Sequence, residues 1–197
     1  MRGMMSLYGL DGKISAQQAT DLEVAPYTVV KAFDVPVVKD NAFLYLQLND
    51  KEGDLMIDNF YCLSATQDVN DWVNTDWIRT PVKKSADFTG LATMPRANCD
   101  MNAIVRQEKD NAIVEVTLEN ASTALAFFIR LSLKNEKGEL LYPVFWEDNY
   151  LSVIPGGKRT LKCVVPQSVA QAKSVTLTIS GWNVPEKKME LSLGNTK

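Results

Sequence analysis

Two adjacent acids beside two aromatic residues are the first feature of the sequence that could do chemistry. Glu147 and Asp148 lie between Trp146 and Tyr150, and carboxylates next to aromatic rings can bind the hydroxyl groups and apolar faces of sugars. The favoured alternative is structural: Asp148 and Asn149 form a turn with side chains bonded to the backbone, while Trp146 and Tyr150 enter the core. Adjacent strand residues point to opposite faces, which argues against an acid/base pair. The aromatic and polar composition of the segment still makes Trp146, Asp148 and Asn149 our candidate contacts to sugar or to another domain.

Trp182 is the fourth candidate contact residue. It lies in Gly181-Trp182-Asn183, after a predicted final core strand, where an exposed indole could stack on a sugar ring. Packing of the same ring against a neighbouring domain is the favoured interpretation, because large exposed apolar surfaces usually mark interfaces.

The residue types that are absent narrow the chemistry further. The 197 residues contain no histidine, which excludes Ser-His-Asp and Cys-His nucleophile systems and every metal site that needs imidazole. Cys62, Cys99 and Cys163 are far apart and odd in number, so they predict neither a metal knuckle nor a disulfide framework and are interpreted as buried apolar residues. No catalytic residue, metal ligand or cofactor site is predicted.

The charge pattern excludes two classes of partner. The formal net charge is −3, from 21 Lys and Arg against 24 Asp and Glu, and no basic stripe follows the sequence, so nucleic acid is not an expected partner. No run reaches the roughly 20 apolar residues of a membrane helix, and the first ten residues do not resemble a signal peptide. Neither a membrane span nor an export signal is predicted within the chain.

Short strands dominate the predicted secondary structure. Apolar or alternating runs bounded by turn residues are typical of strands, and the only helical candidate, residues 168–173, is short enough to be a loop turn. Short strands at regular spacing predict an all-β sandwich of the immunoglobulin type. The clearest strand signals are residues 43–48, 111–118, 127–133, 160–165 and 174–179.

An internal repeat indicates two such sandwiches in tandem. Residues 6–14 align with 132–140, with a glycine six positions after the serine in both, and residues 22–26 align with 151–155. Each copy then ends in a Val-Pro pair, at Val35-Pro36 and at Val165-Pro166. In the second copy about 35 residues with two strand signals precede the aligned hairpin, whereas the first copy begins at the hairpin. The first sandwich is therefore expected to lack its opening strands, because the parent protein continues upstream or because another copy fills the gap.

These observations divide the chain into three parts. Residues 1–63 are predicted to form the incomplete immunoglobulin-like sandwich and residues 97–197 the C-terminal one. Residues 64–96 lose the strand alternation and contain Trp72 and Trp77, which predicts an ordered connector whose tryptophans pack between the sandwiches.

Four motifs follow one another in the second half of the chain: Phe127-Phe128-Ile129-Arg130, Asp148-Asn149-Tyr150, Pro155-Gly156 and Gly181-Trp182-Asn183-Val184. In this order they resemble the C-terminal immunoglobulin-like domain of the exo-β-D-glucosaminidases of glycoside hydrolase family 2. Residues 7–13, 59–64 and 86–91 are similar to the preceding domain and connector of these enzymes. The related β-mannosidases share the Asp-Asn-Tyr and Pro-Gly motifs, so that branch stays open.

The resemblance implies a five-domain retaining hydrolase in which both catalytic glutamates lie on a TIM barrel. This chain matches the last two domains, and no residue in it corresponds to either glutamate. The predicted function is a non-catalytic accessory region that supports the missing upstream catalytic domains. Similar enzymes are often periplasmic or secreted, and an export signal would lie upstream of Met1.

Two other functions remain open. An independent carbohydrate-binding module would use the aromatic and acidic residues near Trp146 to bind an oligosaccharide. A cell-surface adhesion sandwich rests on fold analogy alone.

Overall fold

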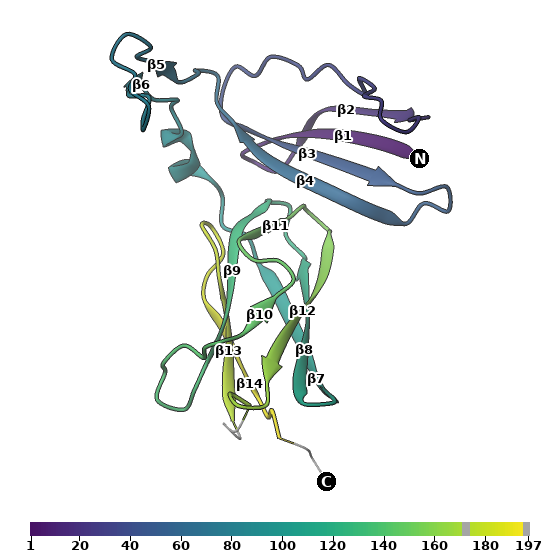
Figure 1. Cartoon of the computed structure of the whole chain (residues 1–197), viewed down its shortest axis with the longest axis vertical. Coiled ribbons are helices and arrows are strands. Elements are labelled where there is room, and N and C mark those ends of the chain that lie inside the picture. The colour runs from purple at the N-terminus through teal and green to yellow at the C-terminus, as the bar shows by residue number, and fades with distance from the viewer. Residues whose placement is uncertain (171–173, 195–197) are drawn as a thin grey trace. The chain divides into compact units, whose positions relative to one another are not determined.

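The computed structural model describes residues 1–170 and 174–194. The chain forms two compact units, Met1–Met94 and Pro95–Lys197, each described by itself below. Strands supply nearly all regular structure, apart from one 3-10 helix at Thr89–Thr93 (Figure 1). In the part of the chain that the structure describes, no helix is long and apolar enough to cross a membrane.

A single antiparallel sheet of four strands dominates the first unit (Figure 1). Its strand order is β2-β1-β3-β4, so β2 and β4 form the two edges. A small two-stranded ladder follows, formed by β5 (Val69–Asn70) and β6 (Val82–Lys84). The sheet strands are β1 (Arg2–Gly9), β2 (Ile14–Asp21), β3 (Ala42–Asn49) and β4 (Leu55–Leu63).

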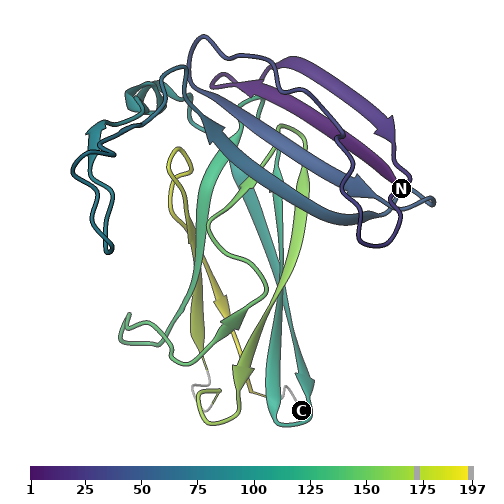
Figure 2. The same ribbon diagram turned by 45° about the horizontal axis from the view of Figure 1, so that its top comes forward.

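The strand alternation in this sheet gives it two different faces. One face carries a small core in which Met5, Leu7, Ala42 and Leu44 are buried. The other face is aromatic: the rings of Phe43 and Phe60 stack with centroids 5.3 Å apart, and Tyr45 contacts Phe60 at 6.0 Å. Residues 22–41, between β2 and β3, form no strand, and Figures 1 and 2 both draw them as an irregular connection.

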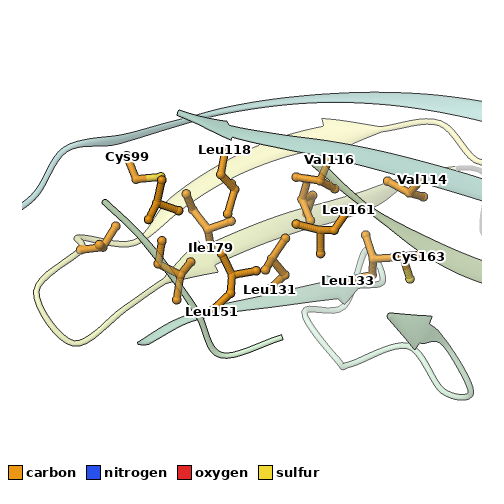
Figure 3. Packing of buried hydrophobic residues seen from close by; sticks show 14 of the residues in the cluster. Cys99, Val114, Val116, Leu118, Leu131, Leu133, Leu151, Leu161, Cys163 and Ile179 are labelled. Atoms are coloured by element: carbon orange, nitrogen blue, oxygen red, sulfur yellow. The ribbon is translucent and has the colours of Figure 1, made fainter. Parts of the chain in front are cut away.

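The second unit is a sandwich of two antiparallel sheets. The first sheet has the order β10-β12-β8-β7 and the second β11-β9-β13-β14. Both turn a regularly alternating apolar face inward, and Figure 3 shows side chains from the two sheets packed against each other. The strands are β7 (Cys99–Glu108), β8 (Asn111–Asn120), β9 (Ala126–Lys134), β10 (Phe145–Trp146), β11 (Leu151–Val153), β12 (Lys158–Pro166), β13 (Val175–Ser180) and β14 (Lys187–Leu191).

The predicted repeat is present in the hydrogen bonds of the aligned turns. In the first copy the Gly12 amide donates to the Gly9 carbonyl, and in the second the Gly138 amide donates to the Asn135 carbonyl, at 3.0 and 2.9 Å. Both turn glycines have a left-handed backbone, with φ of 82° and 80°, which favours glycine. The prediction of two immunoglobulin-like modules, the first incomplete, is confirmed: the sheet β2-β1-β3-β4 corresponds to β11-β9-β13-β14, and unit 1 has no counterpart of the sheet that contains β8 and β12.

Two further predictions relate to segments between strands. Most of the predicted connector, residues 64–94, belongs to the first compact unit. The division of the chain into residues 1–63, 64–96 and 97–197 stays a prediction. Of the helical candidate at 168–173, residues 168–170 form a turn, and residues 171–173 lie outside the described part.

Candidate functional site

Trp146 and Glu147 lie at an edge of the second sandwich. Trp146 is in the short edge strand β10, opposite Cys163 of β12, and packs partly against the core. The Glu147 amide donates to the Lys162 carbonyl at 2.9 Å, and the Lys162 amide donates to Glu147 Oε2 at 2.8 Å. The Glu147 carboxylate thus extends the ladder between β10 and β12 by one hydrogen bond.

Asp148 stabilises the turn that follows. Its Oδ1 accepts a hydrogen bond from the Asn149 amide at 2.8 Å, and its Oδ2 lies 3.5 Å from the guanidinium of Arg159. Because both Glu147 and Asp148 have local partners, their arrangement is that of a turn rather than of a catalytic carboxyl pair. Whether Asp148 also contacts sugar or another domain stays a prediction.

Asn149 bonds to the edge of β9 as a neighbouring strand would. Its Oδ1 accepts a hydrogen bond from the Leu131 amide at 2.8 Å, and its Nδ2 donates to the Leu131 carbonyl at 3.0 Å. An asparagine amide carries one acceptor and two donors, so Asn149 can bond to both backbone groups of Leu131. It does so just before β11, which begins at Leu151. The favoured structural interpretation of Asn149 agrees with these bonds.

Tyr150 was predicted to enter the core, but its ring is half exposed. Its backbone has a φ of 56° and that of Phe128 a φ of 54°, a region that bulky residues rarely adopt. The two rings lie 5.0 Å apart and are tilted by 40°, and Phe128 is also half exposed. The adjacent Leu151 and Val153 take the inward positions instead. The pair is a surface feature held by strained backbone.

Each residue of the motif Gly181-Trp182-Asn183 makes a close contact with another segment of the second unit. A Cβ on Gly181 would lie 2.8 Å from the Phe127 carbonyl oxygen, so this close approach requires glycine. The Trp182 amide donates to the same carbonyl at 2.9 Å, and the indole is more than half exposed. The buried Asn183 side chain donates to the carbonyls of Pro95 and Leu125.

A feature that the sequence did not predict is an exposed apolar loop in the first unit. Residues 71–81 join β5 to β6, and we call them the apolar loop. Trp72 is 72% and Trp77 93% exposed, and Val73 and Ile78 are similarly open. Neither ring is therefore packed within the first unit, and packing of the two tryptophans between the sandwiches stays a prediction.

Asp71 organises the base of the apolar loop. Its carboxylate accepts hydrogen bonds from the Asn74 side chain at 2.6 Å and the Asn74 amide at 3.3 Å, and lies 3.2 Å from Lys83 Nζ. The hydrogen bond from Asn74, followed by that from Lys83, lowers the pKa of Asp71. At the tip, Asp76 accepts hydrogen bonds from the amides of Ile78 and Arg79. The loop is thus ordered by polar contacts while its apolar side chains remain exposed.

The thiols and acids offer no alternative site among the described residues. Cys99 and Cys163 are buried and Cys62 is partly buried, and burial raises the pKa of all three thiols, which opposes reactivity. Within residues 1–170 and 174–194, no group of three Cys, Asp or Glu side chains is placed to hold a metal ion.

The fold defines a class of protein, tandem immunoglobulin-like modules. The polar motif residues Glu147, Asp148 and Asn149 bond within the structure, and several aromatic side chains are exposed. Residues 77–184 match the family described as the exo-beta-D-glucosaminidase Ig-fold domain. The chain belongs to this family, and the resemblance read from its motifs is confirmed.

Longer proteins contain regions similar to this chain. An exo-beta-D-glucosaminidase of Arthroderma benhamiae is 34% identical over 94% of this chain and 20% of its own length. One of Hypocrea jecorina is 29% identical over 98% of this chain and 21% of its own. The crystal structure of Amycolatopsis orientalis exo-chitosanase CsxA matches 96% of this chain and 23% of its own with a TM-score of 0.82 and 26% identity. The chain thus spans about a fifth of the length of the curated relatives it matches.

Proposed function

We propose that this chain is a non-catalytic accessory region of an exo-β-D-glucosaminidase and supports the catalytic part of its parent enzyme. The observation that carries the proposal is the match itself: nearly the whole chain aligns with relatives of this activity, yet covers only about a fifth of each. Retaining glycosidases need two carboxyl groups about 5 Å apart on a rigid scaffold. The adjacent acids Glu147 and Asp148 have local backbone and side-chain partners, so catalysis is assigned to residues outside this chain.

The apolar loop is the proposed contact with the catalytic part. Its exposed side chains include Trp72, Trp77 and Ile78, and tryptophan is enriched at protein interfaces. Since the loop backbone is held by Asp71 and Asp76, binding would require little ordering of the loop.

Hydrolysis by the purified chain tests the first part of the proposal. PNP-beta-D-glucosamine, which a CsxA variant binds in a solved complex, is the substrate. We expect no release of nitrophenol above buffer. Hydrolysis that co-elutes with the chain and disappears in an Asp148→Asn variant would contradict a non-catalytic role.

Substitution in the apolar loop tests the second part. In the full-length enzyme, the double variant W77S/I78S should lower the thermal midpoint by several degrees, because it removes a packed interface. In the isolated chain the same variant should leave the midpoint unchanged, since both side chains are exposed there. Tyr142→Ser, at another exposed aromatic residue, is the matched control. An unchanged midpoint in the full-length enzyme would exclude the loop as the contact.

A carbohydrate-binding module is the second candidate function. It is favoured by the half-exposed rings of Phe128 and Tyr150, which contact each other, and Tyr150 lies two residues after Asp148. Titration of chitosan oligomers against the fluorescence of Trp146 and Trp182 tests it. A saturable change at millimolar or lower concentration that is lost in Phe128→Ala would support sugar binding, and a flat titration would exclude it.

A further inference from the structure

The connection between β2 and β3 has the composition of a strand but forms none. Residues 28–38 include five valines, a residue type enriched in strands. Val29 is 99% and Val37 95% exposed. Residues 29–41, all of them described, make no backbone hydrogen bond to other described residues. Apolar, β-branched residues are thus left without the ladder that they favour.

The repeat identifies what this connection corresponds to in the second unit. Residues 22–26 align with 151–155, and the structure contains the same turn at both places. The Thr28 amide donates to the Ala25 carbonyl at 3.2 Å, and the Gly157 amide to the Ile154 carbonyl at 2.9 Å. The third residue of each turn is left-handed, with φ of 62° at Tyr27 and 67° at Gly156. Tyrosine rarely adopts this conformation, so the turn is specified by more than local preference.

In the second unit this turn begins strand β12. β12 pairs with β8 along its whole length, from Lys158 opposite Glu119 to Pro166 opposite Asn111. By the same alignment, residues 29–37 occupy the place of β12 in the first unit. The strand that would correspond to β8 is not among residues 1–94.

The core beside the connection is correspondingly incomplete. Phe33 and Val38 pack on the sheet, but a hollow of 330 Å³ remains beside Val38. It is lined by apolar residues that include Leu7 and Ala16, and by polar ones that include Lys39 and Asp40. Leu46 and Leu48 of β3 are only partly buried, and Ile57 of β4, which pairs with Leu48, is exposed. In the second unit, the alternate residues Val114, Val116 and Leu118 of β8 fill the equivalent layer and are fully buried.

We propose that residues 29–37 are a strand acceptor, which pairs antiparallel with a strand of the parent polypeptide outside residues 1–197. The donor would be extended for about eight residues with alternate apolar side chains facing the sheet, by analogy with β8. The curated relatives have about four-fifths of their length outside the matched region, which provides a source for it. This inference rests on the proposed function only in assigning the donor to the parent enzyme.

Amide hydrogen exchange tests the inference. In the isolated chain, residues 29–37 should exchange at nearly the rate of unfolded peptide. In the full-length enzyme, alternate amides of this segment should exchange at least about 100-fold more slowly, because a ladder protects them. Residues 158–166 of β12, which are paired in this chain, should be protected in both samples and are the internal control.

Trypsin gives a second measurement on the same two samples. Lys31 is exposed in the isolated chain, so cleavage after it should be rapid there and at least about tenfold slower in the full-length enzyme. Rapid exchange and rapid cleavage in both samples would overturn the inference. Protection in the isolated chain, with sedimentation as a dimer, would assign the donor strand to a second copy instead.

Hydrolysis of PNP-beta-D-glucosamine by the full-length sample separates this inference from the proposed function. Protection without hydrolysis would keep the strand acceptor and contradict the proposed parent activity. Hydrolysis without protection would support the proposed parent activity and overturn the strand acceptor.

Discussion

Asparagine side chains connect the loops of the second sandwich to its strands. The buried Asn120 donates to the carbonyls of Ala124 and Val153, at 2.8 and 3.0 Å. Asn149 bonds to both backbone groups of Leu131. The Asn183 side chain donates to the Leu125 carbonyl, just before the start of β9. Each supplies both a donor and an acceptor where no strand is available to do so.

Asn183→Ala should be strongly destabilising. It removes the donor to the carbonyls of Pro95 and Leu125 and the acceptor of the Phe127 amide. We expect a loss of about 3 kcal/mol in the free energy of unfolding, measured with urea. Asn102→Ala, on the exposed side of β7, is the control and should change it by less than about 0.5 kcal/mol. Equal effects of the two variants would show that the Asn183 bonds are not important.

The buried thiols predict a loss of stability at alkaline pH. Burial raises the pKa of Cys163 to about 12 and that of Cys99 to about 11. A thiol whose pKa is raised by folding stabilises the fold fully below its unfolded pKa, and this stability is lost as the pH rises above that value. Between about pH 8 and pH 10 each such thiol should lower the free energy of unfolding by an amount on the order of 1–2 kcal/mol.

Urea unfolding at the two pH values measures this cost. Cys163→Val keeps an apolar side chain of similar size and should reduce the difference in the free energy of unfolding between the two pH values by an amount on the order of 1–2 kcal/mol. An unchanged difference would mean that the alkaline loss comes from other groups.

At the scale of elements, the sequence predicted strands where apolar residues alternate in the middle of a sheet. Residues 43–48, 111–118 and 127–133 all lie within observed strands. β1 was not among the clearest predicted strands although it lies inside its sheet. The missed strands β2 and β14 lie at sheet edges, where half of the hydrogen-bonding groups face solvent and polar residues are tolerated. The sequences of these two edge strands therefore lack the apolar alternation on which prediction depends.

The candidate site was less predictable than the strands. Motif residues such as Asp148 and Asn183 could be identified from the sequence, but a hydrogen bond such as that from Asn183 to Pro95 joins residues 88 positions apart. The exposed apolar loop was not predicted, because tryptophan is often buried. Its local order depends on the turn made by Asp71 and Asn74, which composition does not reveal.

Asp71 makes the order of the apolar loop dependent on pH. The hydrogen bond from Asn74 and then that from Lys83 lower its pKa from the ordinary 3.8. A lowered pKa means that the stabilisation is present above the unfolded value and lost as the pH falls through the folded one. The side-chain amide resonance of Asn74, followed by NMR, should therefore titrate with a midpoint below 3.8. Asp71→Asn should abolish that titration, and a midpoint above the ordinary value would contradict the assignment.

At the scale of the whole molecule, the two units have cores of very different size. The second unit buries apolar side chains between two sheets (Figure 3). The core cluster of the first unit has four buried members, Met5, Leu7, Ala42 and Leu44. Since stability depends chiefly on buried apolar area, the four-stranded sheet of the first unit should be the weaker part. The absence from that unit of a counterpart to the sheet β10-β12-β8-β7 thus has a measurable energetic consequence.

Calorimetry of the isolated chain should accordingly resolve two transitions, with the first unit unfolding at the lower temperature. Leu44→Ala and Leu118→Ala make the same deletion in the two cores, and both leucines are buried. Such a deletion costs about 2–5 kcal/mol, which corresponds to a shift on the order of 10 °C for a domain of this size. Leu44→Ala should lower the first transition and Leu118→Ala the second. A single transition that both variants lower equally would contradict separate cores, because it would mean that the two units unfold as one cooperative body.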